Sequence, residues 1–411
     1  NALRAVRRFK ESIDVHTQAA AIARELSDRH GESQALSNLG NALRAVRRFK
    51  ESIDVHTQAA AIARELSDRH GEAEALNNLG GTLIELRRFE EAIDTHTQAA
   101  AIHHKLGNRH SEAAALCNLG SALPEVGRLE EAIDSLTRTV AIFHDLGDRH
   151  GEAQALSNLG NVFQNVGRFE EAINAHTQAI GIYDVVGDHH GEAQALSNLG
   201  NVFRNVGRFE EAINVHTQAA TVSRNLGNQD NEGKALNNLG FVLAEVGRLG
   251  EAIGAFTRTV AIFHDLGDRH GESMAVNNLG LVLVRVRRFE ESIDAFNRAA
   301  IAFHALGDRR REGNALFNLG SALAEVGRLE EAIGTLTRTV AIFHDLGDRH
   351  GESMAVNNLG LMLAQVRRFE DTMDARTQAV TTYHKSGDRH REGMARAAWA
   401  IAHNERWLRQ N

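Results

Sequence analysis

At 411 residues the chain has room for two or three ordinary domains, and its hydrophobic content of 42% is enough for a continuous core. The 36 glycines against a single proline, Pro124, exclude collagen-like and disordered sequences and favour helices that end at glycine. A formal net charge of -8 argues against a general nucleic-acid-binding surface, which needs clustered lysine and arginine. The lone cysteine, Cys117, cannot form an internal disulfide, and no apolar run is long enough to span a membrane. We therefore expect a cytoplasmic protein without membrane contact.

The sequence aligns on itself every 40 residues from Asn1 to Ala400, without insertion or deletion. Residues 1–32 and 41–72 are identical, and a Leu-Gly pair recurs from Leu39-Gly40 to Leu359-Gly360. A fixed period of this length is typical of a solenoid, because each repeat must bury its apolar faces against its neighbours. We predict an all-α fold, a right-handed α-solenoid of about ten antiparallel helical hairpins over 1–400. A polar helical segment over 401–411 is expected to cap the last repeat.

The unit from Arg149 to Asp188 shows how each repeat is built. Its first helix is predicted from about Arg149 to Val166, since Leu156, Leu159, Phe163 and Val166 are spaced three and four residues apart. Gly167 is expected to end this helix in a left-handed conformation. A second helix is predicted over about 169–186 and ends at Gly187, and Asp188 is expected to cap the next repeat. Gly160 and Ala172 are expected to be small because the two helices cross closely there.

These residues resemble the tetratricopeptide repeat. The signature positions of that family correspond, in its order and spacing, to Leu159, Gly160, Phe163, Gly167, Phe169, Ala172 and Ala179. The closing proline of the family is absent, and the second helix is about six residues longer. Repeats of this 40-residue kind are similar to those of Pins-type spindle-orientation adaptors and of bacterial signal-transduction ATPases. The resemblance implies an interaction scaffold that binds a protein or peptide in its concave groove.

Two alternatives to a free-standing scaffold follow from the ends of the chain. Asn1 falls inside the first helix of a repeat, so we expect further sequence before it in the parent protein. The chain would then be a regulatory sensor arm of a larger bacterial signalling ATPase. Near-identical repeats also present one surface many times, so self-association through the ends of the solenoid is a third possibility.

The groove in such a family is lined by the first helix of each hairpin, at positions that differ between similar repeats. The candidates are polar in the middle of the chain and include large apolar side chains further on. Apolar residues on an open surface favour a partner-binding site, although a neighbouring part of the same chain would also cover them. The predicted peptide-binding residues are Asn158, Asn161, Asn198, Asn201, Arg204, Lys234, Asn238, Phe241, Asn278, Leu281, Val284, Phe317 and Asn318.

An asparagine recurs once per repeat, from Asn38 to Asn358. Its amide both donates and accepts hydrogen bonds, so a row of these residues would match the backbone of an extended peptide. The alternative is that each side chain bonds to the neighbouring helix or to its own turn. The sequence leaves both interpretations open.

No catalytic, cofactor or metal site is predicted. The recurrent His30, His70, His110 and His150 lie at the corners between repeats, too far apart to share a zinc ion, and are expected to be solvated loop residues. A second set, His16, His56, His96, His176 and His216, occupies a packing position and is expected to be buried with satisfied hydrogen bonds. No phosphate-binding loop or catalytic triad stands out from the repeat. We therefore predict that the protein is not an enzyme.

Overall fold

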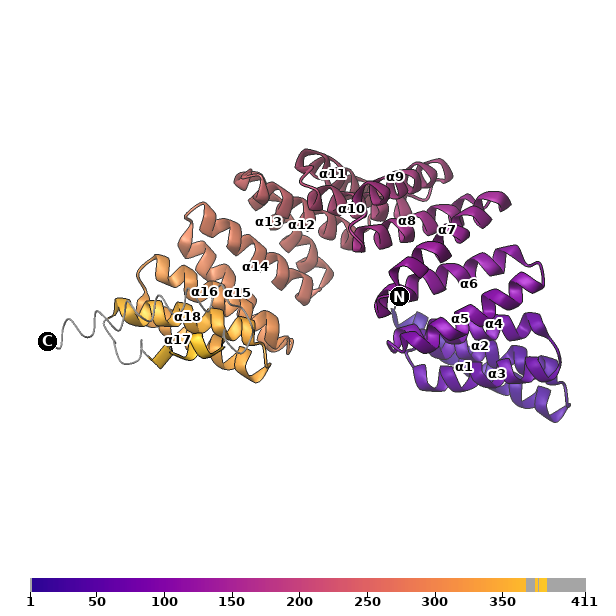
Figure 1. The fold of residues 1–411 in the computed structure, drawn as a ribbon. Helices are drawn as coiled ribbons and strands as arrows, with labels where there is room; N and C mark the ends of the chain where they lie inside the picture. The colour runs from indigo at the N-terminus through magenta and orange to yellow at the C-terminus, as the bar shows by residue number, and fades with distance from the viewer. Residues whose placement is uncertain (1, 367–373, 376, 383–411) are drawn as a thin grey trace. The chain divides into compact units, whose positions relative to one another are not determined.

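The computed structural model describes residues 2–366, 374–375 and 377–382, and within them it contains α-helices, one 3₁₀ helix and no strand. Each helix packs against the next one along the chain inside two compact units, residues 1–207 and 208–411. Figure 1 shows the antiparallel hairpins that this packing produces. The predicted all-α solenoid is confirmed. The capping segment predicted over 401–411 lies outside the described residues.

The first unit contains ten α-helices within its described part, in which the even-numbered helices α2 to α8 are the first members of hairpins. Their bounds are α1 Ala2–Glu25, α2 Arg29–Ala45, α3 Phe49–Glu65, α4 Arg69–Glu85, α5 Phe89–Lys105, α6 Arg109–Ala122, η1 Leu123–Val126, α7 Leu129–Leu146, α8 Arg149–Asn165, α9 Phe169–Val186 and α10 His189–Asn205. Pro124 explains η1, because a proline cannot donate the backbone hydrogen bond that would continue α6.

The second unit continues the same pattern. Its helices are α11 Phe209–Asn225, α12 Gln229–Glu245, α13 Leu249–Leu266, α14 Arg269–Arg285, α15 Phe289–Ala305, α16 Arg309–Glu325, α17 Leu329–Asp345 and α18 Arg349–Gln365. Besides the hairpin contacts, α14 touches α16, and α16 touches α18. The first helices of successive hairpins therefore lie side by side.

The ends of the helices follow the predicted chemistry. The Asp188 carboxylate accepts a hydrogen bond from the Gly191 backbone N–H at 3.0 Å and caps α10. Gly167 and Gly187 have φ of 77° and 75°, the left-handed conformation that ends a helix at little cost for glycine. The predicted stop at glycine is confirmed at both positions. The described residues also place five non-glycine residues in this conformation: Ser27, Arg47, Ser67, Arg87 and Arg287.

The crossing of α8 and α9 explains the small residues. A Cβ atom added at Gly160 would lie 2.7 Å from the His176 ring, closer than carbon atoms can pack. Ala172 has no exposed surface, and it belongs to a cluster with Leu159, Val162 and Phe163. The predicted close approach of the two helices is therefore confirmed. α8 is also in contact with α10, the first helix of the next repeat.

Candidate functional site

A polar cavity of about 290 Å³ lies between α8 and α10 in the first unit, with the end of α9 as its base. Its lining is rich in amide side chains and has no lysine or arginine. The lining residues are His150, Gln154, Ser157, Asn158, Asn161, Tyr183, Asp188, His190, Gly191, Gln194, Ala195 and Asn198. The cavity thus brings together three of the residues predicted from the sequence, Asn158, Asn161 and Asn198.

Helical spacing places the amides on shared faces. Gln154, Asn158 and Asn161 are four and three residues apart along α8, so they project from one side of that helix. Gln194 and Asn198 repeat the first of these spacings on α10. Since α8 and α10 are in contact, the two amide faces converge on the cavity.

Tyr183 forms the base of the cavity. Its side chain is buried, and a Cβ atom added at Gly191 would lie 2.5 Å from its ring. Glycine at 191 therefore makes the space that the tyrosine occupies. Burial raises the pKa of the Tyr183 phenol, and the neighbouring Ser157 hydroxyl opposes part of that rise. The phenol is consequently a neutral hydrogen-bonding group at neutral pH.

At the rim of the cavity, side chains of two successive repeats are in contact. His150 Nδ1 lies 3.4 Å from the Asp188 Oδ2 atom, and the His150 ring meets the Tyr183 ring edge-on at 6.0 Å. The same contact recurs where His30 faces Asp68 at 3.4 Å and His110 faces Asp148 at 3.2 Å. The expectation that these histidines are solvated is confirmed, because all of them are exposed. Their expected place in a loop is wrong: they lie in the first turn of a helix, and His30, His110 and His150 contact the cap of the next repeat.

The recurrent asparagine links neighbouring helices at several positions. The Nδ2 atoms of Asn118 and Asn278 donate to the Oδ1 atoms of Asn77 and Asn237 at 3.1 Å and 3.0 Å. Asn158 instead donates to the Ser121 hydroxyl at 3.3 Å, because the preceding repeat has Cys117 at the position of Asn77 and Asn237. The interpretation that these side chains bond to the adjacent helix therefore holds at these three residues.

The amides inside the cavity behave differently. Among the described residues, the side chains of Gln154, Asn161, Gln194 and Asn198 form no hydrogen bond, and Asn158 uses only its Nδ2 group. Donor and acceptor atoms of both kinds are therefore available at the surface of the cavity. A ligand with alternating N–H and C=O groups would satisfy them.

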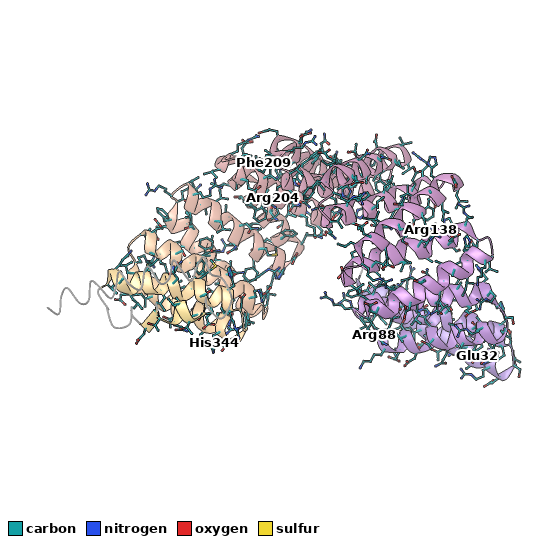
Figure 2. All side chains as sticks on the ribbon, viewed as in Figure 1. Glu32, Arg88, Arg138, Arg204, Phe209 and His344 are labelled. Carbon is teal, nitrogen blue, oxygen red and sulfur yellow. The ribbon has the colours of Figure 1, made fainter. Side chains whose placement is uncertain are left out.

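The other predicted site residues lie outside this cavity. Asn201 and Arg204 are further along α10, with Arg204 in its last turn (Figure 2). In the second unit, the Lys234 ammonium is paired with Asp230 at 2.6 Å and Asn278 is buried. The remaining residues there are half-buried or exposed and belong to α12, α14 and α16: Asn238, Phe241, Leu281, Val284, Phe317 and Asn318.

Sequence reasoning missed Gln154, Gln194 and Tyr183 as parts of the site. The two glutamines precede Asn158 and Asn198 by one helical turn, and this spacing could have identified them. Tyr183 is one of two tyrosines in the chain, and the other, Tyr383, has the same repeat position, where the remaining repeats have alanine, histidine, serine or phenylalanine. Its role as the base of a cavity depends on Gly191, which only the three-dimensional packing shows.

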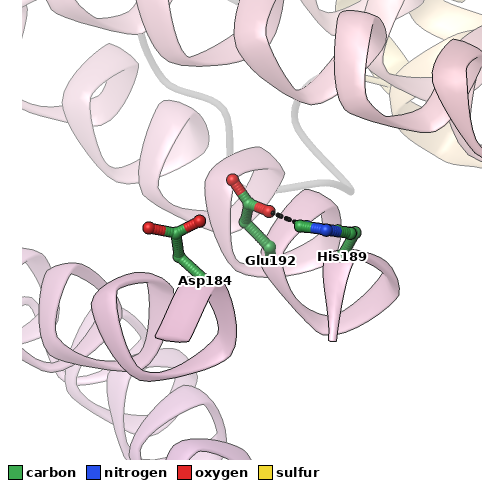
Figure 3. Close-up of side chains that lie close together, drawn as sticks. All are labelled: Asp184, His189 and Glu192. Atoms are coloured by element: carbon green, nitrogen blue, oxygen red, sulfur yellow. Dashed lines mark hydrogen bonds and ion pairs between the residues drawn. The ribbon is translucent and has the colours of Figure 1, made fainter. Parts of the chain in front are cut away.

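Close to the cavity, Asp184, His189 and Glu192 form a cluster whose oxygen and nitrogen atoms lie within 4.8 Å of one another (Figure 3). His189 Nδ1 is 2.8 Å from Glu192 Oε2, and this interaction raises the pKa of His189. All but one of the other repeats have arginine at the position of His189, as in the Arg149–Glu152 pair at 2.5 Å. The ion pair therefore accounts for the cluster as a variant of the usual corner between repeats.

The buried histidines require a correction. His56 and His176 have no exposed surface, and neither ring nitrogen of either residue has a hydrogen-bond partner. His96 is bonded only through Nδ1, to Asn77 at 2.9 Å. Burial lowers the pKa of all three to about 4. The expectation that these residues have satisfied hydrogen bonds is wrong for both nitrogens of His56 and His176 and for Nε2 of His96, because the rings fill the space above glycines, which offer no side-chain partner.

A family model described as tetratricopeptide repeat matches most of the chain, in overlapping segments. The matched residues are 1–65, 71–145, 111–184, 151–225, 191–265, 231–301 and 272–345. No curated protein matches the sequence significantly. Within the described residues, no helix is both long and apolar enough to cross a membrane.

Solved structures with similar folds have low sequence identity to the chain. One is a signal transduction ATPase with numerous domains, with a tetratricopeptide repeat sensor, from Pyrococcus horikoshii. Its TM-score is 0.57 at 14% identity, and the match covers 92% of this chain and 54% of that protein, so the chain spans about half of it. The apo form of RapI gives a TM-score of 0.50 at 12% identity and covers 73% of this chain and 100% of that one. BtubC from P. vanneervenii gives 0.49 at 20% identity, with coverages of 53% and 92%.

Proposed function

The chain belongs to the tetratricopeptide repeat family, and from this premise we propose that it is a protein-binding scaffold whose polar cavity between α8 and α10 holds an extended peptide segment. The family match supports an interaction scaffold in general. The open amide groups of the cavity support the more specific proposal, because α8 and α10 bring amides from two neighbouring helices to one cavity.

The chemistry of the lining favours a peptide backbone as the ligand. An extended segment exposes N–H and C=O groups in alternation, and each asparagine or glutamine offers both partners. The cavity volume of about 290 Å³ is at the lower end of the range for ligand sites, so it suits a short stretch of chain. With no lysine or arginine in the lining, a terminal carboxylate would lack a permanent counter-charge there.

The first experiment is a pull-down from lysate of the source organism, followed by anisotropy titrations with overlapping peptides of each captured protein. Asn158→Ala combined with Asn198→Ala should weaken the bound peptide about tenfold or more, since two hydrogen-bonding groups are lost. The matched control combines Asn38→Ala with Asn78→Ala, at the same repeat position but outside the cavity, and should change affinity less than about twofold. Equal losses in both double variants would refute the assignment of the site.

A second arm addresses the residues predicted in the other unit. Asn278→Ala combined with Asn318→Ala removes the same side chain in α14 and α16. If this variant loses binding and the cavity variant does not, the peptide site lies in the second unit and the proposal for α8 and α10 is wrong. Circular dichroism on every variant separates a lost contact from lost helicity.

A sensor arm of a larger signalling ATPase is the alternative function. The similarity to the Pyrococcus horikoshii protein, over 92% of this chain, supports it at the level of fold. The coding sequence upstream of Asn1 tests this alternative directly. A phosphate-binding loop followed by an ATPase domain would favour the arm, whereas a start codon close to Asn1 would refute it.

A further inference from the structure

One repeat of the second unit has an exchanged pair of residues. The order at 301–302 is Ile-Ala, where the equivalent positions 141–142 and 341–342 have Ala-Ile. In five other repeats this isoleucine is buried, with Ile62, Ile102, Ile142, Ile182 and Ile342 all between 4% and 7% exposed. Ile262 is half-buried, and Ile22 in α1, which has no preceding hairpin among the described residues, is 56% exposed. Ile301 is 63% exposed instead. The exchange therefore turns a core side chain outward and leaves only a methyl group in its place.

A cavity opens where the isoleucine is missing. Ile342 lies over Gly313 and Ile262 over Gly233, each within 3.3 Å of where a Cβ atom would stand. The equivalent pair here is Ala302 over Ser273, and both line a cavity of about 400 Å³ between α14 and α15. Its walls are mainly apolar, formed by Val276, Ala299, Ile301, Ala302, Ala305 and Leu306.

Two arginines stand at the edge of this cavity without their usual partner. At the equivalent place in other repeats, an arginine in the first turn of the first helix bonds the buried glutamate, as in Arg309–Glu312 at 2.7 Å. An arginine of the second helix also reaches this glutamate, as in Arg258–Glu232 at 2.9 Å. Figure 2 labels Arg138, which approaches Glu112 at 3.6 Å in the same way.

Here the corresponding residues are Arg269, Arg298 and Glu272. Among the described residues Arg269 forms no ion pair, and Arg298 reaches only Asp294, at 3.9 Å. Glu272 is bound by His264 at 3.3 Å, and its side chain is 24% exposed against 2% for Glu312. Both guanidinium-bearing side chains line the cavity, together with Glu272.

We propose that this cavity is a second binding site, which takes a segment of a partner protein carrying an aliphatic or aromatic side chain beside an aspartate or glutamate. The apolar side chain would enter the space that isoleucine fills in other repeats. The neighbouring carboxylate would pair with Arg269 and Arg298, whose planar guanidinium groups suit carboxylates. An exposed isoleucine at the rim adds apolar contact area.

The exchanged pair supplies a matched variant. Ile301→Ala combined with Ala302→Ile restores the order of the other repeats, and Ser33 beneath Ile62 shows that serine and isoleucine fit together at this place. The variant should keep the fold and fill the cavity. Its thermal midpoint, expected to equal or exceed that of the natural chain, confirms that any loss of binding is local.

The test is a selection of random short peptides displayed on phage against the full chain, with the Ile301→Ala/Ala302→Ile variant in solution as competitor. The peptides that bind the natural chain in the presence of this competitor should carry an apolar residue next to an acidic one. The affinity of these peptides should be about tenfold lower for the Ile301→Ala/Ala302→Ile variant, called the restored variant, than for the natural chain. It should be about fivefold lower or more for Arg269→Ala and for Arg298→Ala. Asn158→Ala/Asn198→Ala should leave it unchanged, which separates this site from the proposed peptide cavity.

Several results would overturn the proposal. These are the absence of any peptide that discriminates against the restored variant, the absence of acidic residues among the selected peptides, and equal affinity for the arginine variants. Sedimentation equilibrium supplies a further arm. If the natural chain self-associates and the restored variant does not, the occupant is a second copy of the chain and not a different partner.

Discussion

In each repeat, one side chain packs over the glycine at which the two helices cross. The type of this side chain affects the stability of the fold. His176 lies over Gly160, while Leu136 lies over Gly120 and Leu336 over Gly320 in the same way. The leucines have almost no exposed surface and no polar atom. The imidazole brings two buried nitrogen atoms that lack partners, and each unpaired polar group costs about 1–3 kcal/mol.

We therefore expect His176→Leu to stabilise the protein by about 1–3 kcal/mol, as measured by denaturant unfolding. Leucine already fits this place in other repeats, so no new cavity or clash is expected. The reciprocal change, Leu136→His, serves as the control and should destabilise by a similar amount. A lower stability for His176→Leu would mean that the imidazole has an unrecognised role.

The same residues predict how stability depends on pH. The pKa of His56, His96 and His176 is lowered by burial to about 4, below the ordinary value of 6.5. As the pH falls below about 6.5, the unfolded chain takes up protons that the folded chain does not, so stability is lost down to about pH 4. At about pH 5.5 the loss is about 1 kcal/mol per histidine.

Thermal unfolding between about pH 7.5 and 5.5 measures this effect, because it covers the range in which free histidine titrates. The midpoint should fall over that range, and the fall should be smaller in His176→Leu. An unchanged midpoint across the range would contradict the prediction.

At the scale of the helix, the turns between hairpin members differ in strain. Gly167 and Gly207 adopt positive φ without a Cβ atom, whereas Arg47 and Arg287 adopt φ of 63° and 61° with one. A left-handed conformation costs roughly 1–2 kcal/mol for an ordinary residue. Glycine loses more conformational entropy on folding, which offsets part of the difference.

We expect Arg47→Gly and Arg287→Gly each to stabilise the protein by up to about 1 kcal/mol, measured as a shift in the denaturant midpoint. Both side chains are exposed and form no ion pair with a described residue, so little else is removed. Gly167→Ala is the control and should destabilise by about the same amount. A loss of stability in both arginine variants would show that the side chains matter more than the backbone strain.

At the scale of the whole molecule, the principal helix contacts connect each α-helix only to α-helices one or two places away in the chain. Stability is then close to a sum of repeat and interface contributions. Deleting residues 149–188, which removes α8 and α9 together, should preserve the helical signal per residue and a cooperative transition. Deleting residues 149–168 alone leaves a hairpin without its first helix and should broaden the transition. Circular dichroism melts of the two deletions compare these outcomes, and equal damage in both would argue against modular stability.

Much of the fold could be predicted from the sequence because the repeat supplies the same information many times. The 40-residue period, the capping Asp188 and the glycines at 167 and 187 are local signals, and each predicted its element within a residue or so. Local signals are enough to predict these helices because the packing partners of each helix are the nearest helices in the chain. The amide composition of the candidate site was also visible in the sequence, at Asn158, Asn161 and Asn198.

The tertiary structure decided what the repeated residues do. The sequence by itself determined that an asparagine stands once per repeat, but only packing shows that Asn278 bonds to Asn237 while Asn198 bonds to no described residue. The cavity over Tyr183 and the vacancy beside Ala302 likewise depend on which atoms of the next helix lie opposite. Period and capping are properties of one stretch of chain, whereas hydrogen-bond satisfaction and empty volume are properties of two surfaces in contact.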